Sequence, residues 1–97
     1  MYEIGRQIKT QTIDGLQVRK PIEKQALEIL SITLEKGAVF PEHTSPRDAH
    51  LVVLEGALDF FIDGRVFSLK ALEDFSFPKE VTHRVEARED SRFLIIR

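Results

Sequence analysis

The side chains best suited to acid–base chemistry or metal binding in this 97-residue chain are its three histidines, His43, His50 and His83. An imidazole exchanges a proton near neutral pH and is a common metal ligand. His43 lies in the proline-bounded segment 40–46, and His83 follows a turn in residues 77–82. Because proline cannot donate to a strand ladder, we expect both histidines in loops between strands. His50 instead opens an apolar run, which places it on or beside a strand.

Composition excludes several kinds of chemistry and partner. Cysteine is absent, which rules out disulfides, thiolate metal sites and cysteine nucleophiles. The 14 basic and 16 acidic residues give a formal net charge of −2 without any block of one sign, so we expect no nucleic-acid partner. No apolar run approaches the ~20 residues that span a bilayer, and the N-terminus carries no leader pattern. We therefore expect a cytoplasmic protein that does not bind membranes.

The elements that must position the histidines are short strands. Beyond about residue 26, alternating apolar runs are broken by turn residues every eight to twelve positions, the spacing of a small all-β sandwich or barrel. Asp63-Gly64 between two apolar runs predicts a tight hairpin. The continuous run 93–96 predicts a strand buried on both faces. The clearest strands carry their apolar residues on one face, namely Leu30, Ile32 and Leu34 in one and Leu58, Phe60 and Ile62 in the next.

Two segments are less clearly patterned. Residues 22–30 have apolar positions at helical spacing after Pro21, yet the alternation that follows favours a strand entering from about Ala26. The first twenty residues are expected to form one or two edge strands with a turn at Asp14-Gly15. No repeat or linker divides the chain, and we expect a single domain over residues 1–97, with 1–25 as N-terminal edge strands and 26–97 as the barrel.

Over residues 30–96 the chain resembles the cupin family. The first cupin motif is Gly, five residues, His, one residue, His, three or four residues, Glu, six residues, Gly. Gly37, His43 and Gly56 match it in register. The second is Gly, five residues, Pro, one residue, Gly, two residues, His, three residues, Asn, and here Pro78 and His83 match. The positions of its remaining residues are occupied by Leu72, Glu80 and Ala87.

The resemblance implies a cupin-like double-stranded β-helix, a jelly-roll-type barrel preceded by an N-terminal edge-strand segment. In the family, two histidines and a glutamate of the first motif join the second-motif histidine around a divalent metal. Carried over by position, those four sites are His43, Ser45, Ala49 and His83, which we expect to line one ligand pocket. Only His43 and His83 are metal-binding residue types. If the site binds a divalent metal, we expect iron, manganese, zinc or nickel at low occupancy.

Neighbouring residues could replace the missing ligands only by breaking strand alternation. If Ala49 points inward, then Asp48 and His50 point outward unless a bulge re-aims them. Glu42 has the same difficulty beside His43. His50 is accordingly expected on the outer barrel face or at a subunit contact. Arg47, in the loop that carries His43, is a candidate to reach an anionic ligand at the barrel mouth.

Two functions remain open from the sequence. The first is a module that binds a small molecule in the barrel without a complete metal site. The alternative is a metal-dependent cupin enzyme, dioxygenase- or isomerase-like, with His43 and His83 as metal ligands. A third possibility is a purely structural or interaction domain. Whether the protein is an enzyme, and which ligand it takes, is not decided by the sequence. A homodimer is expected, because the apolar edge-like segment 8–18 invites strand pairing and similar small cupins often pair through their N-terminal strands.

Overall fold

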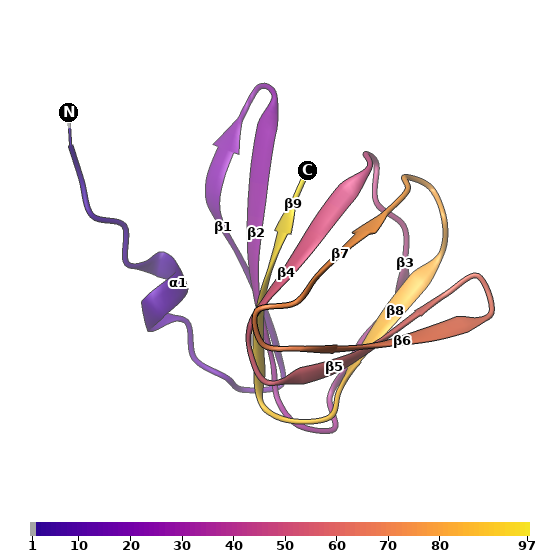
Figure 1. The fold of residues 1–97 in the computed structure, drawn as a ribbon. Coiled ribbons are helices and arrows are strands. Elements are labelled where there is room, and N and C mark those ends of the chain that lie inside the picture. The colour runs from indigo at the N-terminus through magenta and orange to yellow at the C-terminus, as the bar shows by residue number, and fades with distance from the viewer. Residues whose placement is uncertain (1) are drawn as a thin grey trace.

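The computed structural model describes residues 2–97 and consists almost entirely of antiparallel β-structure (Figure 1). Sheet A has five strands in the order β1-β2-β9-β4-β7, and sheet B has four in the order β3-β8-β5-β6. The elements are α1 (Gln7–Thr10), β1 (Leu16–Lys24), β2 (Leu27–Leu34), β3 (Val39–His43), β4 (Ala49–Glu55), β5 (Ala57–Ile62), β6 (Arg65–Lys70), β7 (Asp74–Phe77), β8 (His83–Ala87) and β9 (Ser91–Ile96). The jelly-roll-type barrel expected from the sequence is confirmed.

The core lies between the two sheets and follows the predicted alternation. All six residues of the two clearest apolar faces are buried, three from β2 and three from β5. In β9, Phe93 and Ile95 are buried, whereas Leu94 and Ile96 are half-buried on the outer face of sheet A. The inner face of this strand is therefore fully buried as expected, whereas its outer face is only half-buried.

The Asp63-Gly64 hairpin is confirmed. Ile62 pairs with Arg65 across it, and both turn residues have positive φ, 53° at Asp63 and 70° at Gly64. A two-residue turn with two positive φ values matches the right-handed twist of the flanking strands. The turn therefore fixes the β5–β6 register locally.

The two segments that the sequence left ambiguous are residues 22–30 and the first twenty residues. Residues 22–30 form no helix: they comprise the end of β1, a turn at residues 25–26 and the start of β2, and the two strands pair from Leu16↔Leu34 to Lys24↔Leu27. Of the first twenty residues, those from Leu16 onward belong to β1, which lies at the edge of sheet A and confirms one of the one or two edge strands expected there. The second of these strands is not formed, since residues 7–10 are helical. None of the helices among residues 2–97 is long and apolar enough to cross a membrane.

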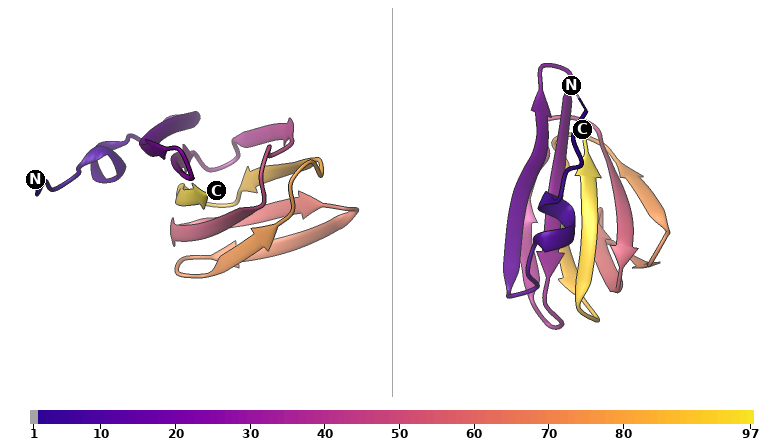
Figure 2. Two further views of the ribbon diagram at one scale, coloured as in Figure 1. Left: turned by 90° about the horizontal axis from the view of Figure 1, so that it is seen from above. Right: turned by 90° about the vertical axis from the view of Figure 1, so that its left-hand side faces the viewer.

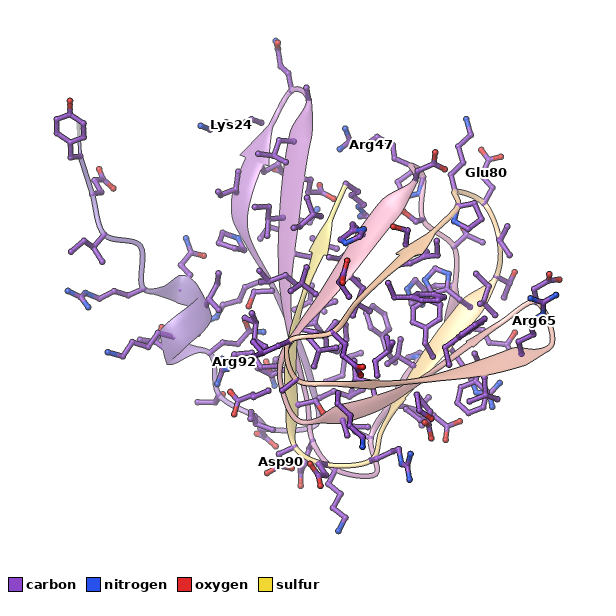
Figure 3. The ribbon with its side chains drawn as sticks, in the orientation of Figure 1. Lys24, Arg47, Arg65, Glu80, Asp90 and Arg92 are labelled. Atoms are coloured by element: carbon purple, nitrogen blue, oxygen red, sulfur yellow. The ribbon has the colours of Figure 1, made fainter. Side chains whose placement is uncertain are left out.

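Side-chain anchoring explains why the segment before β1 leaves the sheet ladder. Gln11 is buried, and its Nε2 donates to the carbonyl oxygens of Gln17 and Ser31 at 3.0 and 2.9 Å. Arg92 Nη1 donates to the carbonyl oxygen of Ile8, and the labelled Arg92 side chain lies toward α1 in Figure 3. The segment is thereby held on the outer side of sheet A, while its N-terminal end extends away from the barrel (Figure 2).

The backbone keeps the turns of the two family motifs even where their glycines are replaced. Gly56 has φ 89°, and a Cβ there would lie 2.3 Å from the Asp90 carbonyl oxygen, so only glycine fits. Leu72 and Glu80, which occupy the two glycine positions of the second motif, have φ 71° and 63°. Left-handed backbone costs a residue with a Cβ about 1–2 kcal/mol. The chain therefore carries strain at Leu72 and Glu80.

Leu72→Gly is expected to raise the free energy of unfolding by about 1 kcal/mol relative to Leu72→Ala, because glycine relieves the positive φ while alanine keeps it. Leu72 is 85% exposed, so neither change opens a cavity. Chemical denaturation of the two variants measures the difference. Equal stabilities would show that this turn is unstrained.

Candidate functional site

The register between β3 and β8 brings the two motif histidines together. β3 is the edge strand of sheet B, which is where Pro41 can be tolerated within a ladder. The pairing shifts between Phe40 and His43, and beyond the shift His43 is the direct antiparallel partner of His83. The expectation that both histidines lie in loops was wrong: His43 ends β3 and His83 begins β8.

Both imidazoles are oriented by backbone carbonyl groups. His43 Nδ1 lies 2.6 Å from the Pro41 carbonyl oxygen, and His83 Nδ1 lies 3.0 Å from that of Val81. A carbonyl oxygen only accepts, so each Nδ1 carries a hydrogen, and in the neutral form of either ring the lone pair is on Nε2. The ring centroids are 4.3 Å apart in an edge-to-face arrangement. The pair thus offers two Nε2 acceptors.

His43 and His83 line a cavity of about 180 Å³ between the two sheets. A dry cavity of about 150 Å³ is large enough for benzene. Thr44, Ser45 and Pro46 border it from the β3–β4 loop, and Arg97 borders it from the end of β9. The remaining lining is apolar and comprises Leu30, Ile32, Phe40, Phe60, Phe77, Val85, Phe93 and Ile95. An apolar chamber with a few polar groups is the usual form of a small-molecule site.

His83 is held neutral by its surroundings. Its ring stacks on Phe60 with centroids 5.2 Å apart and lies 4.6 Å from Phe77. Burial lowers the pKa of His83 below its usual value of 6.5; the hydrogen bond to Val81 opposes that shift, and the nearby His43 adds to it. His83 is therefore a buried acceptor at neutral pH rather than a cation.

Ser45 is buried at the cavity but is fully engaged in hydrogen bonds. Its Oγ donates to the Arg47 carbonyl oxygen at 2.6 Å and accepts from Arg97 Nη1 at 3.3 Å. Arg97 Nε in turn donates to Glu28 Oε1 at 2.7 Å. Sequence reasoning missed Arg97, because a single arginine after an apolar strand has no distinguishing pattern. Arg47, the arginine it named instead, is exposed and projects from the β3–β4 loop at the same end of the barrel as Glu80 (Figure 3).

Ala49 is buried in the hydrophobic core and, within residues 2–97, is not among the residues that line this cavity. It borders a surface depression that includes His50 and Ser76. The structure thus gathers His43, Ser45 and His83 around one space and leaves Ala49 outside it. Ala49 occupies the family's glutamate position, and its methyl group has no atom that can bind a metal.

The neighbours considered as replacement ligands also point elsewhere. His50 lies on the outer face of sheet A, with Nδ1 2.6 Å from Ser76 Oγ and Nε2 2.5 Å from Asp74 Oδ2. Asp48 Oδ1 accepts the backbone N–H of Lys79, and Glu42 is exposed. Strand alternation predicted the outward position of His50 correctly, because no bulge interrupts β4 at that point.

The residues at the cavity do not fit a complete mononuclear metal site. Within the part of the chain that the structure describes, no group of three or more His, Asp or Glu side chains is placed to hold a metal ion. Two neutral imidazoles supply no charge compensation for a divalent ion. The Arg97 guanidinium borders the same cavity and would repel such an ion.

The family assignment follows from this fold and site. The family model for the cupin domain matches residues 30–96, and the chain belongs to the cupin family. That stretch contains both motifs, the histidine pair and every residue that lines the cavity except Arg97. No match was found among curated proteins.

Solved structures share the fold at low sequence identity. An RmlC-like cupin from Desulfovibrio desulfuricans is 23% identical, with a TM-score of 0.86 over 99% of this chain and 95% of its own. A cupin superfamily protein from Desulfitobacterium hafniense is 12% identical, with a TM-score of 0.86 over 99% and 90%. KdgF from a Halomonas species is 24% identical, with a TM-score of 0.76 over 89% and 81%. At such identities these similarities establish the architecture alone.

The neutral state of His83 predicts a pH-dependent stability. Its folded pKa lies below 6.5, so below pH 6.5 the unfolded chain binds a proton that the folded chain does not. The free energy of unfolding should therefore fall as pH decreases through this window, with a slope of at most about 1.4 kcal/mol per pH unit for one proton.

His83→Phe keeps an aromatic ring among Phe60 and Phe77 and removes the titration. The unfolding free energy of wild type, relative to that of this variant, should therefore fall from pH 7.5 to pH 5, as measured by urea denaturation. A difference that is independent of pH would contradict a neutral, buried His83.

Proposed function

We propose that this protein binds a small organic molecule in the barrel cavity without a complete metal site. The observation that carries the proposal is that two histidines, each with Nδ1 hydrogen-bonded to a backbone carbonyl group, line an apolar cavity of about 180 Å³. Imidazole acceptors at the wall of an apolar chamber favour a ligand that combines an apolar body with a hydrogen-bond donor.

The alternative, a metal-dependent enzyme with His43 and His83 as ligands, is less well supported. Its favourable feature is that both Nε2 lone pairs are available and that carbonyl groups orient both rings, as is common for metal-bound histidine. Against it stand the engaged hydroxyl of Ser45, the methyl group of Ala49 and the cationic Arg97. For this reason the binding function is preferred.

We also propose that the protein forms a homodimer through its N-terminal segment and the outer face of sheet A. Tyr2 and Ile4 are 103% and 80% exposed on the part of the chain that extends from the barrel (Figure 2). The outer face of sheet A carries a row of half-buried apolar side chains instead of the polar residues usual on a solvated sheet face. The row comprises Ile22, Ile29, Val52, Leu94 and Ile96. A second copy would cover both surfaces.

Phenol tests the binding function, because it joins a ring that fits the cavity to one O–H donor. Protein purified without a nickel column and treated with EDTA should bind phenol saturably, as measured by NMR titration. Because phenol has a single donor, at least one of the two variants His83→Phe and His43→Ala should bind it about fivefold more weakly. That factor corresponds to the loss of one hydrogen bond of about 1 kcal/mol. His50→Ala, on the outer face, should leave it unchanged.

Failure of the metal-free protein to bind phenol would count against the binding function. Co-purification of iron, manganese, zinc or nickel near one equivalent, measured by inductively coupled plasma mass spectrometry, would favour the metalloenzyme instead.

The dimer is tested by light scattering coupled to size-exclusion chromatography. Wild type should elute with twice the 11.2 kDa chain mass, and Leu94→Arg or Ile4→Asp should shift it to the monomer by placing a charge in the apolar contact. Val66→Arg is the matched control, because Val66 is an exposed apolar residue on β6 of the other sheet. A monomeric wild type at micromolar concentration would overturn this proposal.

A further inference from the structure

The cavity faces one permanent charge. Of the residues that line it within the described chain, three are ionisable: His43, His83 and Arg97, with no Asp or Glu among them. An arginine stays protonated in proteins, so the Arg97 guanidinium makes this end of an otherwise apolar chamber cationic.

The guanidinium is held in place and keeps hydrogen-bonding capacity. Arg97 has a side chain that is only 17% exposed, and it pairs with Glu28 through Nε at 2.7 Å. Two backbone hydrogen bonds between the same residues, 2.9 and 2.7 Å long, fix the base of the side chain. Of five guanidinium N–H groups, the described residues engage Nε–H with Glu28 and one on Nη1 with Ser45, which leaves three for a ligand.

The charges around Arg97 are paired along one chain of contacts. Glu28 lies between Arg97 and Lys20, whose Nζ is 3.5 Å from Glu28 Oε2, and Lys20 also pairs with Glu23 at 3.2 Å. Of these four side chains only Arg97 borders the cavity, and no Asp or Glu is among the described residues that line it. A carboxylate in the cavity would therefore meet a guanidinium with no acidic side chain beside it there, and a partly buried guanidinium binds a carboxylate more strongly than an exposed one does.

We propose that Arg97 anchors a carboxylate group of the ligand, so that the cavity selects small apolar carboxylic acids. Ser45 supports this role: it occupies the position of a metal-binding histidine in the family motif, and here its Oγ accepts from Arg97 Nη1. The carboxylate lies at Arg97, while the apolar body occupies the space between Phe60, Phe93 and the histidine pair. This inference rests on the proposed binding function and adds a carboxylate to its ligand class: the carboxylate binds at Arg97, and a hydrogen-bond donor, where the apolar body carries one, faces the histidine pair.

Benzoate and benzamide test the anchor, because they have the same shape and differ in charge. In NMR titrations, metal-free wild type should bind benzoate at least tenfold more tightly than benzamide. Arg97→Gln should abolish that preference. Glu28→Gln breaks the same ion pair but keeps the guanidinium, so it should retain the preference. Arg88→Gln removes a cation on the far side of sheet B, paired with Asp59 at 3.7 Å, and should behave as wild type.

A preference for benzoate that persists in Arg97→Gln, or equal binding of the two probes by wild type, would overturn the anchor. Loss of the preference in both Arg97→Gln and Glu28→Gln would do the same, since it would trace the effect to the ion pair. Phenol binding separates the two levels: wild type that binds phenol without preferring benzoate refutes the anchor alone, whereas wild type that binds none of the three probes refutes the binding function as well.

Discussion

The site depends on the antiparallel pairing of β3 with β8. His43 and His83 are far apart in the sequence, and this pairing makes them direct partners. A slip of one residue would turn one imidazole to the other face of the sheet. The register shift between Phe40 and His43 accommodates Pro41 at the edge of the sheet, and after the shift His43 pairs with His83. Each ring is then fixed by a carbonyl group only two residues away.

A second consequence of the fold is that a cationic side chain lies beside one of the family's metal-ligand positions. Two of the four positions that hold a metal in the wider family carry Ser45 and Ala49 here, and the structure places a guanidinium beside Ser45. Arg97 can occupy this place because Glu28 balances part of its charge across the β2–β9 contact. An unpaired charge at such a position would be costly. The cavity therefore remains polar at one end without a metal-binding set of carboxylates and imidazoles.

The backbone tolerates more sequence change than the motifs suggest. Leu72 and Glu80 adopt positive φ at positions where the family motif has glycine. The hydrogen bonds of these turns explain why the geometry persists, since Leu72 N–H donates to Val53 and Glu80 N–H donates to Ser45. By contrast, Gly56 has no such freedom, because the Asp90 carbonyl group occupies the space of a Cβ. Packing of neighbouring backbone therefore decides which glycine is required.

Local sequence predicted the features that arise within one strand or one turn. The alternation in β2 and β5, the Asp63-Gly64 hairpin and the outward position of His50 were all predictable, because side-chain direction and turn type depend on a few consecutive residues. The motif spacing also identified His43 and His83 as candidates for one pocket. The helix at residues 7–10 was not predictable in this way, since contacts of Gln11 and Arg92 with distant backbone hold that segment.

The sequence by itself therefore determined the all-β architecture, the cupin register and the two histidines at its centre. Tertiary structure alone decided what surrounds them: that His83 is neutral within an aromatic enclosure, that Ala49 lies outside the cavity, and that Arg97 lies at its edge. The physical reason is that burial, charge balance and cavity lining each depend on contacts between strands that are distant in sequence. The spacing of residues along one strand does not specify those contacts.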